Sequence, residues 1–195
     1  MIHKISYYFS IKLSSNTDEQ EILQYGFECL INSIIPISFF LLFAILQNIF
    51  LETLIWITLF LLLRNYIGGY HASTSIRCIV LSTLYGLFMI LCIKYIHSVH
   101  LFIEVLICSI ITIYHIIFGT ILNDKDLVIN YKKYKLLSLI IILIESIFII
   151  VFNLNSCRLH LCIFISMISA ELLHYIEKIK VIIRKNASFL SFFPH

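Results

Sequence analysis

A histidine and a cysteine seven residues apart lie in the most polar stretch of the sequence, Arg64–Cys78. They are His71 and Cys78, and the adjacent glycines Gly68 and Gly69 come just before them. A cysteine near a histidine is the smallest set of side chains for thiol catalysis, because the imidazole takes the thiol proton and the thiolate is the nucleophile. His71 and Cys78 are therefore the candidate catalytic pair.

The spacing of this pair sets a structural condition. On a continuous helix, seven residues put both side chains on one face but roughly 10 Å apart along the axis. That separation is too large for direct proton transfer, which requires hydrogen-bond reach. A productive pair needs either a break in the helix or pairing across two subunits of a homodimer. Gly68 and Gly69 permit unusual backbone conformations, so we expect a re-entrant turn in this segment.

The composition places most of the chain in lipid. Of its 195 residues, 61% are hydrophobic and 13% are charged, and the mean hydropathy is +0.99. An ordinary soluble domain has about 45–50% apolar and about 25% charged residues, so the soluble class is excluded. The net charge of +3 comes without a long basic stripe, which argues against nucleic acid as a partner. No H-E-x-x-H motif or comparable cluster indicates a metal, and we expect no cofactor.

Six apolar runs approach the length of about 20 residues that a helix needs to cross a membrane. They predict an all-α membrane bundle that forms one domain over residues 1–195. Residues 1–28 mix apolar and charged positions and predict an interfacial amphipathic helix. The six spans are expected at Cys29–Leu46, Ile49–Leu63, Ile79–His97, Leu101–Leu122, Leu136–Leu154 and Leu159–Ile176.

The positions of Lys and Arg predict the orientation, because cytoplasmic loops carry the excess of positive charge. With six spans and the N-terminus inside, 12 basic residues are cytoplasmic and two are outside. We therefore expect a multi-pass protein of the cell membrane, with both termini and the 64–78 segment in the cytoplasm. The cytoplasmic set is Lys4, Lys12, Arg64, Arg77, Lys125, Lys132, Lys133, Lys135, Lys178, Lys180, Arg184 and Lys185, and the outer set is Lys94 and Arg158.

The polar stretch also carries a family resemblance. Membrane cysteine peptidases of the accessory gene regulator protein B (AgrB) family process quorum-sensing propeptides. Their signature is similar to the run Leu63-Arg64-Asn65-Tyr66-Ile67-Gly68-Gly69-Tyr70-His71-Ala72 followed by Cys78. The upstream run Tyr25-Gly26-Phe27-Glu28 also resembles the family's stretch before its first span. Length and hydropathy match over nearly the whole chain.

The resemblance implies an activity and a set of site residues. His71 and Cys78 would be the catalytic pair of an endopeptidase that removes the C-terminal part of a short, AgrD-like propeptide. The acyl-enzyme thioester on Cys78 would then allow the propeptide to close a thiolactone or lactone ring. Arg64, Gly68, Gly69 and Glu28 occupy positions that match the family pattern. Arg64 would bind a propeptide carboxylate or reach the interface by snorkelling, and Glu28 is a candidate for orienting His71.

Two other interpretations remain open at this stage. Ser73 or Ser75 would be the nucleophile if His71 activated an alcohol, although these residues also suit an oxyanion donor. The chain would be a non-catalytic exporter or channel if Glu145, Glu171 and His115 lined a path. Against that, buried polar contacts between spans are the simpler role for Glu145, Glu171 and His174.

Glu104 and Glu52 lie near the outer ends of their spans. Because water is available at the membrane surface, we expect both carboxyl groups to reach it.

Overall fold

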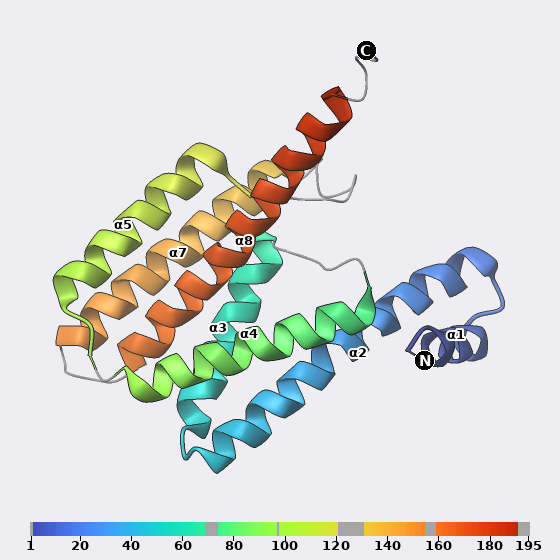
Figure 1. The fold of residues 1–195 in the computed structure, drawn as a ribbon, viewed down its shortest axis with the longest axis horizontal. Coiled ribbons are helices and arrows are strands. Elements are labelled where there is room, and N and C mark those ends of the chain that lie inside the picture. Colours follow the sequence, from blue (N-terminus) through green and yellow to red (C-terminus); the bar gives the residue numbers. More distant parts are fainter. Residues whose placement is uncertain (1, 69–73, 97, 121–130, 155–158, 191–195) are drawn as a thin grey trace. The chain divides into compact units, whose positions relative to one another are not determined.

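The structure is a computed structural model that describes residues 2–68, 74–96, 98–120, 131–154 and 159–190, with side chains up to residue 183. Every element in this described part is a helix (Figure 1). The helices are α1 (Ile2–Leu13), α2 (Thr17–Leu46), α3 (Phe50–Ile67), α4 (Ser75–Tyr95), α5 (Leu101–Phe118), α7 (Tyr131–Leu154) and α8 (Leu159–Leu190).

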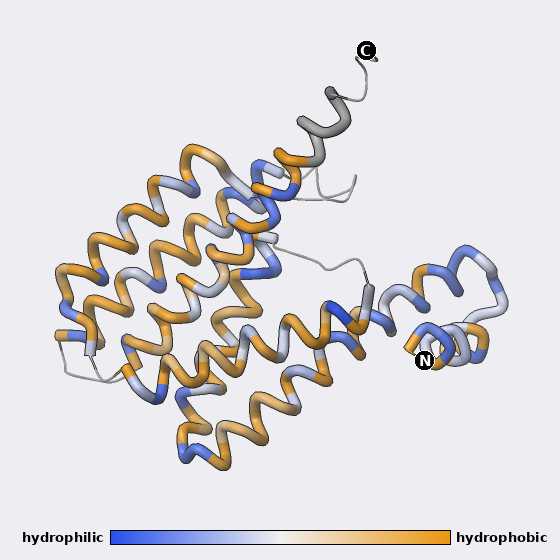
Figure 2. Tube along the Cα trace, in the orientation of Figure 1, coloured by the Kyte–Doolittle hydropathy of each residue, from blue (hydrophilic) through white to orange (hydrophobic). Residues whose placement is uncertain are grey.

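Six of these helices are long and apolar enough to cross a membrane, which confirms the predicted all-α membrane class. Figure 2 shows the pattern along the trace, with hydrophobic residues along the helices and hydrophilic residues mostly near their ends. Three helices begin before the expected spans: α2 starts at Thr17, α4 at Ser75 and α7 at Tyr131. Polar residues continue a helix beyond the membrane core, where water and headgroups accept them, so hydropathy alone places these ends too late.

The chain packs as two compact units. Unit 1 comprises Met1–Phe50 and Ala72–Ile90, which hold α1, α2 and most of α4. Unit 2 comprises Leu51–His71 and Leu91–His195, which hold α3, α5, α7 and α8. Each unit is described by itself below.

In unit 1, the N-terminal segment differs from the expected single helix over residues 1–28. Only α1 is separate, and residues 17–28 are the first turns of the long helix α2. Asn16 is the N-cap of α2, because its side-chain oxygen accepts a hydrogen bond from the Asp18 backbone N–H at 3.2 Å. Helix α1 packs against α2 with Ser6 and Ser10 buried, while Tyr8 is exposed.

Helices α2 and α4 of unit 1 approach each other closely at one glycine. Gly86 on α4 lies against the ring of Phe40 on α2, which is buried. A Cβ atom at Gly86 would overlap that ring. The glycine is therefore what lets the aromatic side chain reach the α4 backbone.

Unit 2 is held by the packing of α7 against both α5 and α8, which lie side by side in Figure 1. A continuous apolar core runs through these helices and includes the end of α3. Its most deeply buried members are Leu63, Ile67, Ile142, Ile149 and Met167. Burying side chains of this size stabilises by about 1.5–3 kcal/mol each in water, but between lipid-embedded helices close packing supplies the stabilisation instead.

Candidate active site

The first half of the predicted site is the end of α3. Arg64 lies in the last turn, with its guanidinium carbon 5.9 Å from the centre of the Phe60 ring. Gly68 follows the helix with a φ of 79° and donates its backbone N–H to the Arg64 carbonyl oxygen at 3.0 Å. This is a left-handed helix cap, a conformation that favours glycine because any Cβ would be strained there. The sequence pair Gly68-Gly69 thus begins with a glycine that the turn requires.

The second half of the site is the start of α4. Cys78 is the fourth residue of this helix and is half-buried. Its backbone N–H donates to the Thr74 carbonyl oxygen at 3.0 Å, and the Thr74 hydroxyl accepts from the Arg77 backbone N–H at 3.4 Å. Thr74 therefore caps α4. Ser75, the other supporting hydroxyl, is the first residue of the helix and is half-buried.

Gly69, His71 and Ser73 lie outside the described residues. The described residues on either side still answer one question. Because α3 ends at Ile67 and α4 begins only at Ser75, no continuous helix joins positions 71 and 78. The helix is interrupted at Thr74, which lies between the two catalytic candidates. The re-entrant turn falls on residues outside the described ones, and it remains a prediction together with the pairing of His71 and Cys78 within one subunit or across two.

Glu28 lies on α2 in unit 1 and is half-buried. In the described part of the chain it forms no hydrogen bond or ion pair with Cys78. Its proposed role in orienting His71 stays a prediction.

A buried polar cluster joins α5, α7 and α8 in unit 2. His115 Nε2 lies 2.7 Å from Ser138 Oγ, and His115 Nδ1 lies 3.4 Å from Glu171 Oε1. The Ser138 hydroxyl donates to the Lys135 carbonyl oxygen at 2.9 Å, so it accepts from His115 Nε2–H. Nδ1 and the Glu171 carboxylate would then both be acceptors unless one of them carries a further proton.

A third polar side chain adjoins this cluster. His174 on α8 is fully buried, and its ring centre is 6.0 Å from those of His115 and Tyr114. The interhelical polar contact expected for Glu171 is confirmed by its contact with His115.

A second histidine–glutamate contact joins the same two helices. Glu104 Oε1 on α5 lies 3.4 Å from His160 Nε2 on α8, and Glu104 Oε2 accepts a hydrogen bond from Asn153 on α7 at 2.8 Å. Glu104 is fully buried, so the prediction that it reaches water was wrong. A position near a helix end does not show which face a side chain occupies, and here Glu104 faces the neighbouring helices. Glu52, in the first turn of α3, is half-buried.

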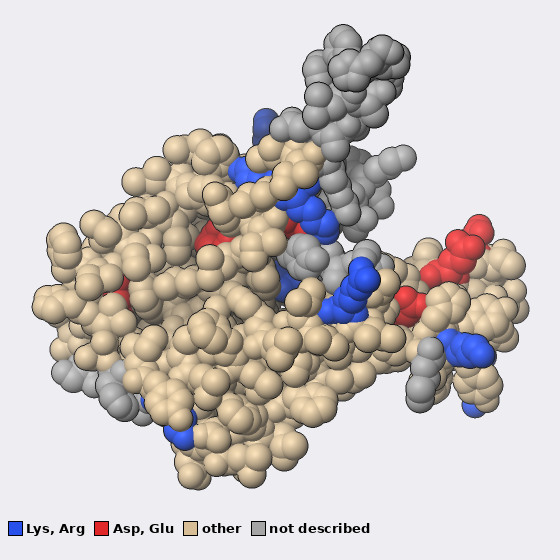
Figure 3. All heavy atoms as spheres, viewed as in Figure 1, with Lys and Arg blue, Asp and Glu red and all other residues tan. Residues whose placement is uncertain are grey.

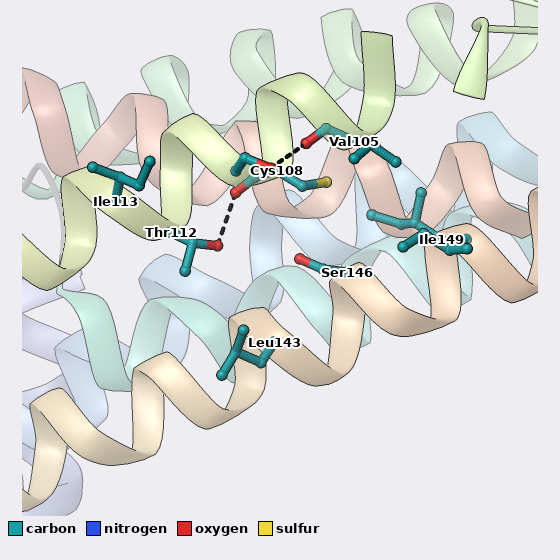
Figure 4. Close-up of a pocket in the computed structure, with 9 residues that line it drawn as sticks. Val105, Cys108, Thr112, Ile113, Leu143, Ser146 and Ile149 are labelled. Carbon is teal, nitrogen blue, oxygen red and sulfur yellow. Dashed lines mark hydrogen bonds between the residues drawn. The ribbon is translucent and has the colours of Figure 1, made fainter. Parts of the chain in front are cut away.

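Cys108 is a buried thiol elsewhere in unit 2, on a cavity of about 300 Å³ between α5 and α7. Figure 4 shows Cys108, Thr112 and Ser146 around this cavity, together with apolar neighbours. The hydroxyls are already used, since Thr112 donates to the Cys108 carbonyl oxygen at 2.8 Å and Ser146 donates to that of Ile142 at 2.7 Å. The cavity therefore presents polar groups whose hydrogen bonds are made within their own helices.

Basic side chains gather at the end of unit 2 where α3 and α5 finish and α7 begins. Lys135 donates to the Ile116 carbonyl oxygen at 2.8 Å, and Lys178 lies 3.7 Å from the centre of the Phe118 ring. Arg64 is at the same end, because Tyr66 on α3 is in ring contact with Tyr134 on α7. We call the end of unit 2 that carries Arg64, Lys135 and Lys178 the basic end. Figure 3 shows Lys and Arg side chains on a surface that is mostly uncharged.

Comparison with known proteins identifies the family. A family model described as "Accessory gene regulator B" (AgrB) matches residues 2–179, and the chain belongs to this family. Two relatives in Clostridium perfringens, "Putative AgrB-like protein" of strain SM101 and "Putative AgrB-like protein 2" of strain 13, are each 36% identical over 99 residues. The match covers 49% of this chain and 44% of each relative, so the chain spans about half the length of these relatives. No solved structure shows significant similarity to it.

The hydroxyl residues Ser73, Thr74 and Ser75 are expected from the sequence to satisfy free backbone groups at the break, and the structure shows Thr74 doing so. Thr74 caps the helix that carries Cys78, and the signal for it was present as a threonine three residues before Arg77. Ser138 completes the polar cluster with His115, but these residues are 23 positions apart. No local pattern in the sequence indicates that contact.

Proposed function

We propose that this chain is a membrane cysteine endopeptidase that processes a short propeptide of the accessory gene regulator system. The observation that carries the proposal is the placement of Cys78 in the first turn of α4, after a break in the helix, in a chain of the AgrB family. A half-buried thiol at a helix start is open to a substrate, and the positive end of the helix dipole favours negative charge that develops nearby.

The reaction has two acyl-transfer steps. The Cys78 sulfur, deprotonated by His71, attacks a backbone carbonyl carbon of the propeptide, and the C–N bond breaks. His71 returns its proton to the leaving amine, so the C-terminal piece departs and a thioester remains on Cys78. A cysteine or serine side chain of the propeptide then attacks the thioester. This step restores the Cys78 thiol and closes a thiolactone or lactone ring.

Water must be kept from the thioester, because hydrolysis would give a linear peptide irreversibly. Ile76 and Val80, two positions on either side of Cys78 on α4, present apolar side chains at the surface. Apolar side chains at these positions support the exclusion of water. Ser75 is the nearest supporting hydroxyl and Gly68 and Gly69 provide the turn. Arg64 is the candidate for binding a carboxylate of the substrate at the basic end.

The orientation is part of the proposal. The basic end carries Arg64, Lys135 and Lys178, and positive charge favours the cytoplasmic side. We therefore place this end, both termini and the thiol chemistry at the cytoplasmic face of the cell membrane. The partners in this proposal are a short, AgrD-like propeptide and membrane lipid, and a second subunit joins them if His71 and Cys78 pair across a homodimer.

The test is the mass of a candidate propeptide, encoded beside this gene, after co-expression with variants of the full chain. Wild type should give truncated or cyclised peptide, whereas Cys78→Ala and His71→Ala should leave it intact. Cys29→Ala is the matched control, because Cys29 is an exposed thiol on α2. That variant should process the peptide as wild type does.

Two outcomes would overturn the proposal. Processing that continues with Cys78→Ala would remove the thiol as nucleophile and favour Ser73 or Ser75. Export of unprocessed peptide that depends on Glu171 or His115, but not on Cys78, would favour the exporter interpretation.

A further inference from the structure

A second cavity in unit 2 lies where α3, α7 and α8 meet. Its volume is about 340 Å³, at the lower end of the range for small-molecule sites. Leu62, Ile144 and Phe148 are exposed at its rim, while Ile163 is buried. The remaining apolar wall residues are Leu59, Ile141 and Phe152. The cavity is thus accessible from the apolar surface of these helices.

One polar side chain lines this cavity, and it is Glu145 on α7. Its side chain is buried, with only 2% of the residue exposed. Neither of its two carboxyl oxygens has a hydrogen-bond partner among the described residues. A carboxylate in such apolar surroundings is costly unless a cation or hydrogen-bond donor pairs with it.

Two other cavities among the described residues of unit 2 differ in this respect. In the cavity of Figure 4, the Thr112 and Ser146 hydroxyls donate to their own helices. In a cavity of about 360 Å³ between α5 and α8, the one carboxyl group is that of Glu171, which faces His115. Both carboxyl groups lack a hydrogen bond among the described residues, but Glu171 faces a histidine and Glu145 has no such contact there.

We propose that the Glu145 cavity binds a lipophilic amine that enters from the membrane. The amino group pairs with the Glu145 carboxylate, and the hydrocarbon body lies against Leu62, Ile144 and Phe148. A charge-assisted hydrogen bond of this kind is stronger in an apolar site than in water. A fatty acid of the same length is rejected, because two carboxyl groups would face each other without a cation.

The test uses a photoreactive primary alkylamine that carries a diazirine in its chain, with the matching alkane as the probe without an amino group. The full chain is placed in phosphatidylcholine nanodiscs, because that lipid has no primary amine to compete. Crosslinks are mapped by mass spectrometry. The amine should crosslink to Leu62, Ile144 and Phe148 about tenfold more than the alkane does, the factor that one charge-assisted hydrogen bond supplies.

Matched variants separate the carboxyl group from general membrane attraction. Glu145→Gln should lower amine crosslinking at this cavity about tenfold and leave alkane crosslinking unchanged. Glu52→Gln, which removes a carboxyl group at the start of α3, should change neither. The cavity of Glu171 is an internal control, and its rim residues Ile110 and Leu172 should show no preference for the amine.

Competition by unlabelled compounds for the crosslinks of the wild-type chain tests the proposal even if Glu145→Gln does not fold. An unlabelled alkylamine should suppress the crosslinks, whereas a fatty acid of equal length should not. Equal labelling by amine and alkane, or equal competition by amine and acid, would overturn the proposal. All measurements can use the Cys78→Ala chain, so they do not depend on the peptidase proposal.

Discussion

The backbone N–H of Cys78 donates to the carbonyl oxygen of Thr74 at 3.0 Å, so the candidate nucleophile closes the first turn of its helix. The position of the sulfur therefore depends on how well α4 begins. The Thr74 hydroxyl, which accepts from Arg77, supports that beginning.

The first prediction concerns this cap. Thr74→Val removes the accepting oxygen and should destabilise the start of α4 by about 1 kcal/mol. We expect a several-fold slower alkylation of Cys78 by a maleimide and slower propeptide processing. Thr74→Ser keeps the oxygen and should behave as wild type. Loss of function in both variants would show that the threonine methyl group matters and not the cap.

The second prediction concerns the buried contact between His115 and Glu171. His115→Ala and Glu171→Gln should each destabilise unit 2, because each leaves a buried polar group without its partner. The double variant should cost less than the sum of the two, with a coupling of about 1–3 kcal/mol. Reversible unfolding in mixed micelles measures the four chains. Additive costs would contradict an interaction between these two side chains.

The third prediction concerns Gly86. Gly86→Ala places a methyl group against the Phe40 ring and should destabilise the α2–α4 packing by about 1–3 kcal/mol. Phe40→Leu removes the ring and should recover part of this loss when the two substitutions are combined. The same micelle unfolding measures it, and Gly26→Ala is the control because a Cβ at Gly26 meets open space. A double variant no more stable than Gly86→Ala would contradict the contact.

The fourth prediction concerns orientation. In a chain whose own cysteines are replaced, a single cysteine at Lys133 should be protected from a membrane-impermeant maleimide added to whole cells. A single cysteine at His100, which precedes α5, should be labelled. Labelling in the opposite sense would reverse the topology and move the basic end outside.

The spans and the helical break could be predicted from the sequence for local reasons. A run of about 20 apolar residues has few alternatives to a membrane helix, because lipid offers backbone groups no other partner. The break before Cys78 follows from Gly68 and the hydroxyl residues near it. Neither inference requires knowledge of which residues meet across the fold.

The polar contacts could not be predicted, because they depend on helix rotation and pairing. The position of Glu104 near a helix end predicted contact with water, but the rotation of α5 about its axis directs this side chain toward His160. Glu145 looked like a contact between spans, yet it lines a cavity. When a helix is apolar on every side, its hydropathy pattern does not show which face packs against the neighbouring helices.

The two histidine–glutamate contacts have a consequence for how the protein is made. Glu104 and His115 are eleven residues apart on α5, and their partners His160 and Glu171 are eleven residues apart on α8 with the residue types exchanged. Sliding one helix by a turn would break both contacts together, so the register is all-or-none. Because α7 precedes α8 in the chain, Glu104 and His115 can meet Asn153 and Ser138 during synthesis before α8 supplies His160 and Glu171.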